Sequence, residues 1–240
     1  MENNGDDKTS RLPVTLKTID FSYDKPVRRN DLVDARKYNK IDKSIAEHAK
    51  LGTNGVLYVK EEAFSSVFNV NKSDAAYIYE NQIPKTEKRS FDGSNYAHSS
   101  AVVGLVDKKS QEVRNAKEQA ILQYSRDSLI SVSDSPQMQD VRRQVDAFVN
   151  EERRKLKDLR GIEFDEVTGE PLRKGAAFHH YNPTKLHTDP EDSVDPAKGR
   201  NLNVETHLDV HRRSINDEEQ FARYQKEKQG ASDLQNSSDE

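Results

Sequence analysis

The chain has 240 residues, of which 33% are charged and 32% are hydrophobic, and its mean hydropathy is −1.01. This apolar fraction is low for a single large core and predicts small folded units joined by exposed helices and flexible tails. No apolar run approaches the ~20 residues that a membrane span needs, and the polar amino terminus lacks the apolar stretch of a signal peptide. We therefore expect a cytoplasmic protein with no membrane contact.

The sequence contains no cysteine, which excludes disulfide bonds and cysteine-ligated zinc. Any metal must therefore be held by His, Asp, Glu or Asn side chains. The formal net charge of −4 argues weakly against a protein coated with basic surface for nucleic acid. A nuclease must not hold its substrate too tightly, however, so the charge does not exclude one.

The amino-terminal two-thirds of the chain is predicted to be mostly helical. Residues 1–25 are polar and lack periodicity, which is typical of a disordered tail. Residues 26–80 form a helical region, in which apolar spacing predicts a helix at 31–50 that could break near Asn39.

Two apolar stripes follow within residues 59–80, separated by a short break at 69–71. Two short helices joined by such a tight turn resemble a helix-turn-helix, whose second helix would present Asn71, Lys72 and Tyr77 to DNA. An ordinary pair of antiparallel helices is the commoner meaning of this pattern, and the weak basic charge of the stretch favours it. The same helices could also bind a protein partner.

The middle of the chain predicts a linker and then two helices. Residues 81–110 are rich in Ser, Asn, Lys and Gly and predict a linker with at most one short strand, at 101–106. Residues 111–160 have helical periodicity. The second helix starts at Ser135–Pro136, because a serine oxygen caps the first turn and proline is tolerated there. Its end, EERRKLKDLR, is charged on most sides, which is typical of a helix face exposed to solvent. Its arginines and lysines could also contact phosphates.

Five of the seven histidines lie between His179 and His211. His207 and His211 are four residues apart in a stretch, 204–213, that can be helical. Both imidazoles would then project from one face of the helix and could chelate one ion. Such a pair alone is a weak signal, since it also arises by chance.

The other two histidines of interest form a doublet, His179–His180, after a short apolar run that is compatible with a strand. Adjacent strand residues point to opposite sides, so one histidine can face a metal while the other faces a bound substrate. Asn201 and Asn203 precede the predicted helix. An asparagine there can cap the helix and bond its neighbouring backbone, and it would hold the loop that aims the doublet.

A histidine doublet, an asparagine and then H-x-x-x-H resembles the HNH endonucleases, also called His-Me finger or ββα-metal nucleases. The resemblance covers about residues 161–216. Upstream, FDEVTGEPL at 164–172 is similar to the turn before the first strand of many members, with Thr168–Gly169 at its tip. Many relatives carry zinc-binding cysteines there, so this chain looks like the cysteine-free subset, to which the DNase colicins belong.

The resemblance implies an α+β fold class, in which the helical part is followed by a small ββα finger. Such a finger is too small to bury much core by itself, so we expect it to pack on the helix that ends at Arg160. Residues 217–240 are predicted to be a short helix and a disordered acidic tail, the tail starting at Gly230.

The resemblance also implies a role for each motif residue. His179, His207 and His211 would hold one divalent ion, Mg²⁺ or Mn²⁺ in the first place and Zn²⁺ or Ni²⁺ as alternatives. His180 would be the general base, and Asn203 or Asn201 the asparagine of the motif. His187 is a surface residue first and an alternative ligand second. Nearby cations could position a DNA backbone through its phosphates: Arg200, Arg212, Arg213 and Lys174.

The implied activity is metal-dependent hydrolysis of phosphodiester bonds in DNA, in a phage-encoded, antiphage or toxin system. A neutral imidazole takes a proton from water, and the metal stabilises charge on the phosphate and the leaving oxygen. Two alternatives stay open. One is a DNA-binding or regulatory protein that keeps the metal finger for structure, and the other is a helical adaptor with incidental histidines. The presence of every expected histidine favours the nuclease.

Overall fold

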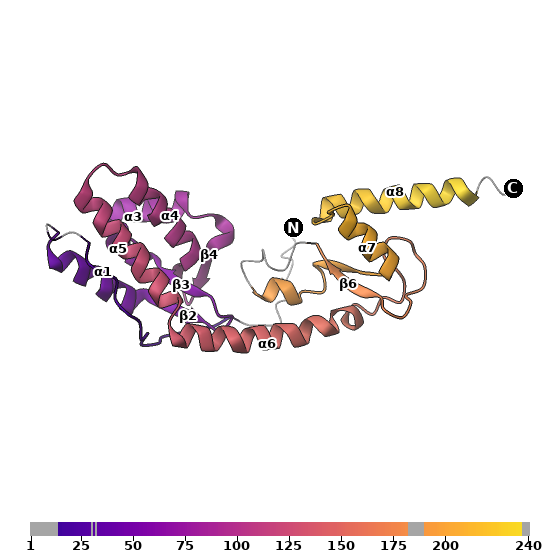
Figure 1. Ribbon diagram of the computed structural model, residues 1–240, viewed down its shortest axis with the longest axis horizontal. Helices are drawn as coiled ribbons and strands as arrows, with labels where there is room; N and C mark the ends of the chain where they lie inside the picture. Colours follow the sequence, from indigo (N-terminus) through magenta and orange to yellow (C-terminus); the bar gives the residue numbers. More distant parts are fainter. Residues whose placement is uncertain (1–13, 30, 32, 182–189, 237–240) are drawn as a thin grey trace. The chain divides into compact units, whose positions relative to one another are not determined.

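The structure is a computed structural model, which describes residues 14–29, 31, 33–181 and 190–236. Helices and strands both contribute, so the fold is α+β (Figure 1). The chain divides into two compact units, one ending at Val145 and the other beginning at Asp146. Each unit has its own cluster of buried hydrophobic side chains. Among the described residues, no helix combines the length and the apolar character that crossing a bilayer requires.

An antiparallel sheet organises the amino-terminal unit, with five strands in the spatial order β1-β2-β3-β5-β4. The strands are β1 (Leu16–Lys17), β2 (Ala49–Gly52), β3 (Leu57–Lys60), β4 (Lys88–Phe91) and β5 (Ser94–His98). Strands β4 and β5 are joined by Asp92 and Gly93, whose φ angles are 49° and 71°. Positive φ at both central residues is the mark of a type I′ hairpin turn.

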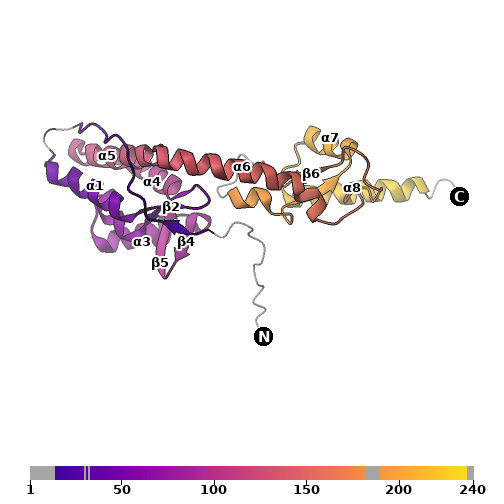
Figure 2. The same cartoon turned by 90° about the horizontal axis from the view of Figure 1, so that it is seen from below.

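Helices pack on this sheet and on one another (Figure 2). They are α1 (Ala35–His48), α2 (Phe64–Val67), α3 (Lys72–Gln82), α4 (Ser99–Glu112) and α5 (Ala116–Ser133). Short 3-10 turns lie at Glu61–Ala63 and Lys85–Glu87. Helices α1 and α4 contact the central strands, and α5 packs against both of these helices.

Helices dominate the amino-terminal part as expected, but the sheet was not predicted. Residues 81–110, predicted to be a linker, contain β4, β5 and most of α4, and the run 101–106 lies inside α4. The strands escaped prediction because their sequences, KRSF and SNYAH, are too polar to alternate visibly between a buried and an exposed face. In α4 the buried hydrophobic residues are Val102 and Val106, which are four apart, as on a helix face.

Three element boundaries also differ from the predictions. Within the predicted tail 1–25, β1 pairs with β2, with Leu16 opposite Gly52. Helix α1 is confirmed but runs without a break at Asn39. The helix predicted from 111 starts only after Asn115, whose side chain caps α5 by accepting the N–H of Lys117 at 2.9 Å.

The predicted pair of short helices is present as α2 and α3, with Asn69 between them at a φ of 51°. The Asn71 side chain is occupied as the cap of α3, where it accepts the N–H of Asp74 at 2.8 Å. Tyr77 is 60% exposed. DNA reading by this pair stays a prediction.

The carboxy-terminal unit holds an antiparallel strand pair and helices. Helix α6 (Pro136–Leu159), whose part up to Val145 belongs to the amino-terminal unit, begins at the predicted start, and Gly161 follows it with a φ of 61°. The predicted cap is wrong, because the buried Ser135 Oγ has no hydrogen-bond partner among the described residues. Strands β6 (Ala177–His180) and β7 (Gly199–Leu202) pair with His179 opposite Arg200. A 3-10 turn at Pro190–Val194 precedes β7, and helices α7 (Val204–Arg212) and α8 (Glu218–Asn236) follow it.

Helix α8 corrects the prediction that a disordered tail starts at Gly230, because the helix continues to Asn236. The side chains around β6, β7, α7 and the start of α8 share a core. Its members are Val167, Tyr181, Leu202, Val210, Ile215, Phe221 and Tyr224.

The end of α6 is attached to this unit by polar contacts. The Arg160 guanidinium lies 2.5 Å from a carboxylate oxygen of Glu166 and donates to the carbonyl of Pro196 at 2.5 Å. Both Arg160 and Glu166 are largely buried, with side chains 14% and 10% exposed. The end of α6, the strand pair and α7 lie in one compact unit.

Candidate metal centre and the adjoining groove

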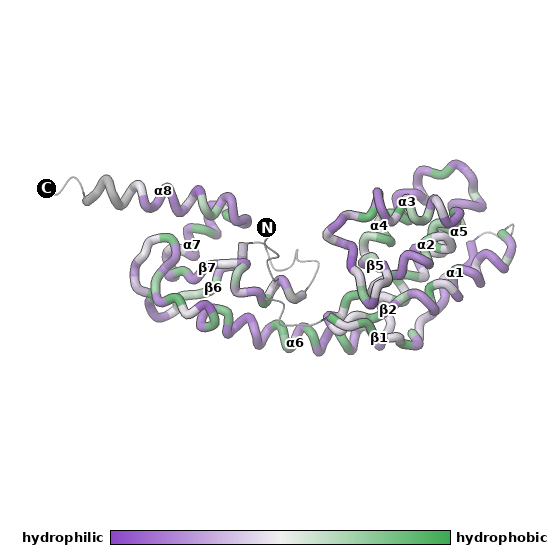
Figure 3. The backbone as a smooth tube through the Cα atoms, turned by 180° about the vertical axis from the view of Figure 1, so that it is seen from behind, coloured by the Kyte–Doolittle hydropathy of each residue, from purple (hydrophilic) through white to green (hydrophobic). Residues whose placement is uncertain are grey.

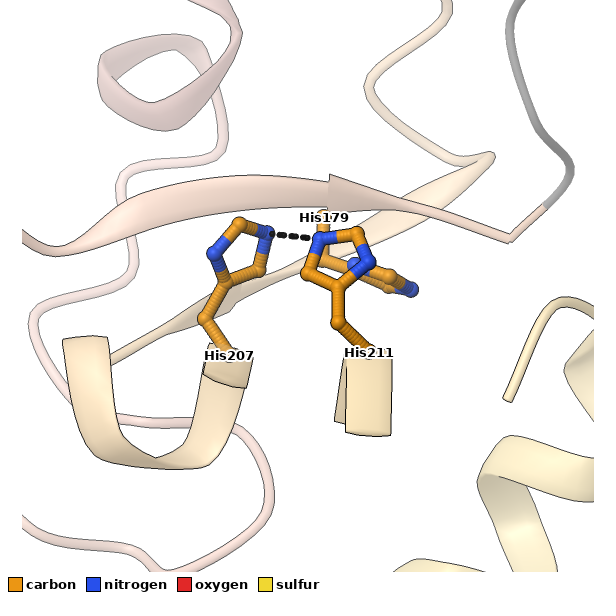
Figure 4. A group of neighbouring side chains, drawn as sticks. All are labelled: His179, His207 and His211. Carbon is orange, nitrogen blue, oxygen red and sulfur yellow. Dashed lines mark hydrogen bonds between the residues drawn. The ribbon is translucent and has the colours of Figure 1, made fainter. Parts of the chain in front are cut away.

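Three imidazoles meet between β6 and α7 (Figure 4). His179 comes from the strand, and His207 and His211 come from successive turns of the helix. One possible ligand atom of each residue lies within 4.8 Å of the others. The two Nε2 atoms of His207 and His211 are 3.1 Å apart. The structure therefore brings together the three histidines that the sequence analysis chose as ligands.

The three histidines differ in burial. His179 is only 5% exposed and stacks on the ring of Phe221, with ring centroids 6.0 Å apart. Its Nε2 atom is buried and has no hydrogen-bond partner within the described part of the chain. His207 is half-buried and His211 is exposed. The cluster is thus anchored in the core on one side and open on the other.

The surroundings keep two of these imidazoles neutral. Burial lowers the pKa of His179 to about 4, helped by the nearby His207 and His211, while the main chain of Ile215 acts weakly in the opposite direction. The pKa of His207 is also lowered, first by burial and then by His211. Neutral imidazole is the form that binds a metal ion.

The geometry and the donor atoms fit a transition-metal ion. Two nitrogens bound to a tetrahedral ion at about 2 Å would lie about 3.3 Å apart, close to the observed 3.1 Å between His207 and His211. Coordination would also satisfy the buried Nε2 of His179. Within the described residues the cluster contains imidazoles and no carboxylate. Such a donor set suits zinc, nickel, copper or iron better than magnesium or manganese, which prefer oxygen ligands.

The lowered pKa of His179 predicts acid sensitivity of the metal-free protein. Below its ordinary pKa near 6.5 the unfolded chain takes up a proton that the folded chain refuses until about pH 4. Stability is therefore highest above pH 6.5 and falls as the pH drops toward 4, by up to about 3 kcal/mol.

Urea unfolding of the metal-free protein between pH 7 and pH 4.5 measures this effect. Carboxyl groups also titrate in this pH range. The pH profile of the wild type is therefore compared with that of His179→Gln, whose glutamine side chain does not titrate. The wild-type protein should lose more stability than the variant as the pH falls. Parallel pH profiles would contradict a buried, neutral His179.

Asn203 and Asn201, between which the sequence analysis left the choice open, have different roles. The Asn203 side chain accepts the N–H of Arg173 at 2.8 Å and donates to the carbonyl of Pro171 at 3.1 Å. It stands at the N-cap of α7 but makes no side-chain capping bond there, because these partners occupy it. Asn201 instead donates to the carbonyl of Lys157 on α6, at 2.9 Å. Asn203 is therefore the residue that holds the loop leading to the histidine doublet.

A buried aspartate that the sequence analysis missed completes this anchor. Asp165 is fully buried, and its Oδ1 accepts the N–H groups of Val167 and Thr168 at 2.9 and 3.0 Å. Its Oδ2 accepts the N–H of Asn203 at 2.7 Å. The aspartate thereby ties the turn with Thr168–Gly169 at its tip to the start of α7. The only signal in the sequence is an aspartate just before a T-G turn, which is too common to predict such a role.

We expect Asp165→Ala to destabilise the carboxy-terminal unit by about 3 kcal/mol or more, because three main-chain N–H groups lose a charged acceptor. Hydrogen exchange of β6 and β7 in the full chain measures the loss. Glu163→Ala, an exposed acidic residue of the same turn, is the control. Equal protection in both variants would show that Asp165 is not needed.

His180 faces away from the cluster, toward α6. Its ring meets that of Phe178 edge to face, at 4.8 Å between centroids. Both line a groove of about 520 Å³, which we call the α6–β6 groove. The lining residues are Asn150, Arg153, Arg154 and Lys157 of α6 with Ala176, Ala177, Phe178 and His180 at the strand. Adjacent histidines of β6 thus face a candidate metal site and a cationic groove.

The cations that the sequence analysis assigned to DNA lie elsewhere. Arg213 pairs with Glu227 at 2.8 Å, and Arg200 stacks over Tyr181 at 4.9 Å. Arg212 and Lys174 are exposed. Arg212 also lies 3.7 Å from a carboxylate oxygen of Asp209. Three of the four therefore have partners within the protein, and none of the four lines the α6–β6 groove. His187, the alternative ligand, lies outside the described residues.

Comparison of the chain with protein-family models, with curated proteins and with solved structures gives no match. A function for this chain is therefore argued from the chemistry of the site and from the order of its motif residues.

Proposed function

We propose that the carboxy-terminal unit is a metal-dependent endonuclease of the HNH type, which hydrolyses phosphodiester bonds in DNA. The observation that carries the proposal is the convergence of His179, His207 and His211 beside a fourth histidine, His180, that faces a cationic groove. Two paired strands followed directly by a helix, β6-β7-α7, also agree with the ββα finger of that family.

The metal ligand His179 and the proposed base His180 lie on opposite faces of β6 and would have different roles in the reaction. An ion held by the three histidines would supply Lewis-acid stabilisation of the charge that develops on the phosphate and the leaving oxygen. His180 would accept a proton from water, whose oxygen then bonds to phosphorus as the phosphorus–oxygen bond to the leaving 3′ oxygen breaks. Asn203 and Asp165 would keep the doublet in place through the loop before β6.

The donor set changes the choice of metal. The family resemblance implies Mg²⁺ or Mn²⁺ first, but three imidazoles without a carboxylate in the described part favour an ion that binds nitrogen well. We therefore propose Ni²⁺ or Zn²⁺ ahead of Mn²⁺ and Mg²⁺.

One observation favours a second candidate function. His179 is buried against Phe221, which belongs to the core of the unit. A bound ion would therefore also stabilise the packing of that core. A non-catalytic DNA-binding or regulatory protein could keep the ion for that purpose alone. Both functions predict that metal stabilises the protein, and only the nuclease predicts cleavage.

Cleavage of a supercoiled plasmid by the full chain tests the proposal. Metal-free protein should be inactive in the presence of a chelator and should nick the plasmid after Mn²⁺, Ni²⁺ or Zn²⁺ is added. The double variant His207→Ala/His211→Ala should be at least about 100-fold slower, whereas His48→Ala, a histidine of the other unit, should match the wild type. Equal rates in the double variant would contradict the site, and metal binding without any cleavage would favour the structural alternative.

A further inference from the structure

We propose that the α6–β6 groove is the clamp for the phosphodiester backbone of the nucleic acid, with the cations of α6 as its contacts. The inference rests on the proposed function and names the part of the chain that holds the substrate. Of the cations that the sequence offered for phosphate contacts, three from EERRKLKDLR line this groove, whereas those assigned from the family resemblance lie outside it.

Helical spacing places the clamp residues on one face. Asn150, Arg153, Arg154 and Lys157 occupy positions i, i+3, i+4 and i+7 of the helix, so their side chains project to the same side of α6. From Asn150 to Lys157 the helix rises about 10 Å. One strand of B-form DNA carries about three phosphates over that length of axis. The row therefore matches a short run of backbone rather than a single phosphate.

The charges in the groove are uncompensated. Three cations line it and, within the described residues, no acidic side chain does. The structure gives Arg153, Arg154 and Lys157 no ion pair within its described part. The cation between them, Lys155, turns to the other side and pairs with Glu151 and Glu152 at 3.0 and 2.8 Å.

The alternation along α6 is visible in Figure 3, where hydrophilic and hydrophobic segments follow one another along the helix. Its buried residues in this part, such as Leu156, face the core, and the cations of the groove stand beside them. Three like charges side by side repel one another unless an anion lies between them.

The wall of the groove at β6 suits a nucleic-acid strand that passes through the groove. Ala176 and Ala177 are small and leave the groove open, and Phe178 and His180 stand at its edge. Guanidinium and ammonium groups bind phosphate oxygens and set the register of a strand without reading its bases. A backbone held by α6 would therefore pass directly beside His180.

Binding in the presence of a chelator tests the clamp separately from cleavage. The full chain is titrated at low salt against labelled duplex DNA, single-stranded DNA and duplex RNA of one sequence, and anisotropy gives the affinity. We expect Arg153→Ala/Arg154→Ala/Lys157→Ala to weaken binding at least tenfold. The slope of log affinity against log salt should also fall by about 2 to 3 for the duplex.

The matched control removes the same number of positive charges from residues that are already paired. Arg143, Lys155 and Arg223 have partners in Asp140, Glu151 and Glu219, and Arg143→Ala/Lys155→Ala/Arg223→Ala should bind within about twofold of the wild type. Arg153→Lys/Arg154→Lys keeps the charge and should retain most of the binding, which excludes misfolding as the cause.

The outcomes separate the two proposals. Loss of binding in the clamp variant alone supports the clamp, and the nucleic acid most affected identifies the substrate class. No binding by the wild type, or equal loss in both triple variants, would overturn the clamp. If the clamp binds but no metal restores cleavage, the nuclease proposal fails alone. If cleavage is normal in the clamp variant, the clamp fails alone.

Discussion

His180→Ala should lower the rate of plasmid cleavage by about 100-fold or more, while metal ions still raise the melting temperature of the variant. The expected loss is that of a general base, whose removal typically costs two to four orders of magnitude. Metal binding should survive because His180 faces the α6–β6 groove and the three candidate ligands lie on the other side of β6.

Two readouts on the same protein separate this role from that of a ligand. Cleavage is measured under single-turnover conditions with the best metal ion, and thermal unfolding is measured with and without it, since a ligand that binds only the folded state raises stability by mass action. His48→Ala serves as the control for loss of a histidine. A cleavage rate within threefold of wild type would exclude His180 as the base, and loss of the metal-dependent stabilisation would make it a ligand.

Gly199→Ala should strongly destabilise the carboxy-terminal unit and weaken metal binding. Gly199 lies opposite His180 in the β6–β7 pair. A Cβ atom there would overlap the main-chain oxygen of His179 and the ring of Phe178. A main-chain oxygen cannot move aside as a flexible side chain can, so the two strands must separate. We expect a loss of about 3 kcal/mol and at least a tenfold loss of metal affinity, because His179 shifts relative to α7.

Gly230→Ala is the matched control for that variant. Gly230 lies within α8, where an added Cβ meets no atom within 4 Å. Alanine favours a helix over glycine by about 0.5 to 1 kcal/mol, so this variant should be as stable as the wild type or more so. Urea unfolding and metal titration compare the two glycines. If Gly199→Ala unfolds and binds metal like Gly230→Ala, the close approach of β6 and β7 is not needed for the site.

The histidine cluster could be predicted from the sequence because the spacing of the histidines within each element shows which side chains share a face. The spacing of four between His207 and His211 needs only a helix, and the alternation of His179 and His180 needs only a strand. The structure contains both elements, α7 and β6, and the three candidate ligands converge.

What supports the cluster could not be predicted, because it depends on contacts between residues far apart in the chain. Asp165 meets Asn203, 38 residues later, and Arg160 meets the carbonyl of Pro196, 36 residues later. No local pattern marks such partners. For the cations at the end of α6 the sequence left two interpretations open, a solvated face or contacts with phosphates, and only the position of β6 beside them favours the second.

The sheet of the amino-terminal unit was missed for a different reason. Asp92–Gly93 is a strong hairpin signal, and the structure has the corresponding turn between β4 and β5. The flanking strands are short and polar, so the stretch resembled a linker. The turn chemistry was therefore a better guide than composition.

Equilibrium dialysis of the metal-free full chain against Zn²⁺, Ni²⁺ or Mn²⁺ tests whether the three histidines hold one metal ion. We expect one ion per chain for the wild type and for His48→Ala, and no tightly bound ion for His207→Ala/His211→Ala, whose folded state is checked by circular dichroism. An unchanged stoichiometry and affinity in the double variant, or no ion bound by the wild type, would contradict it.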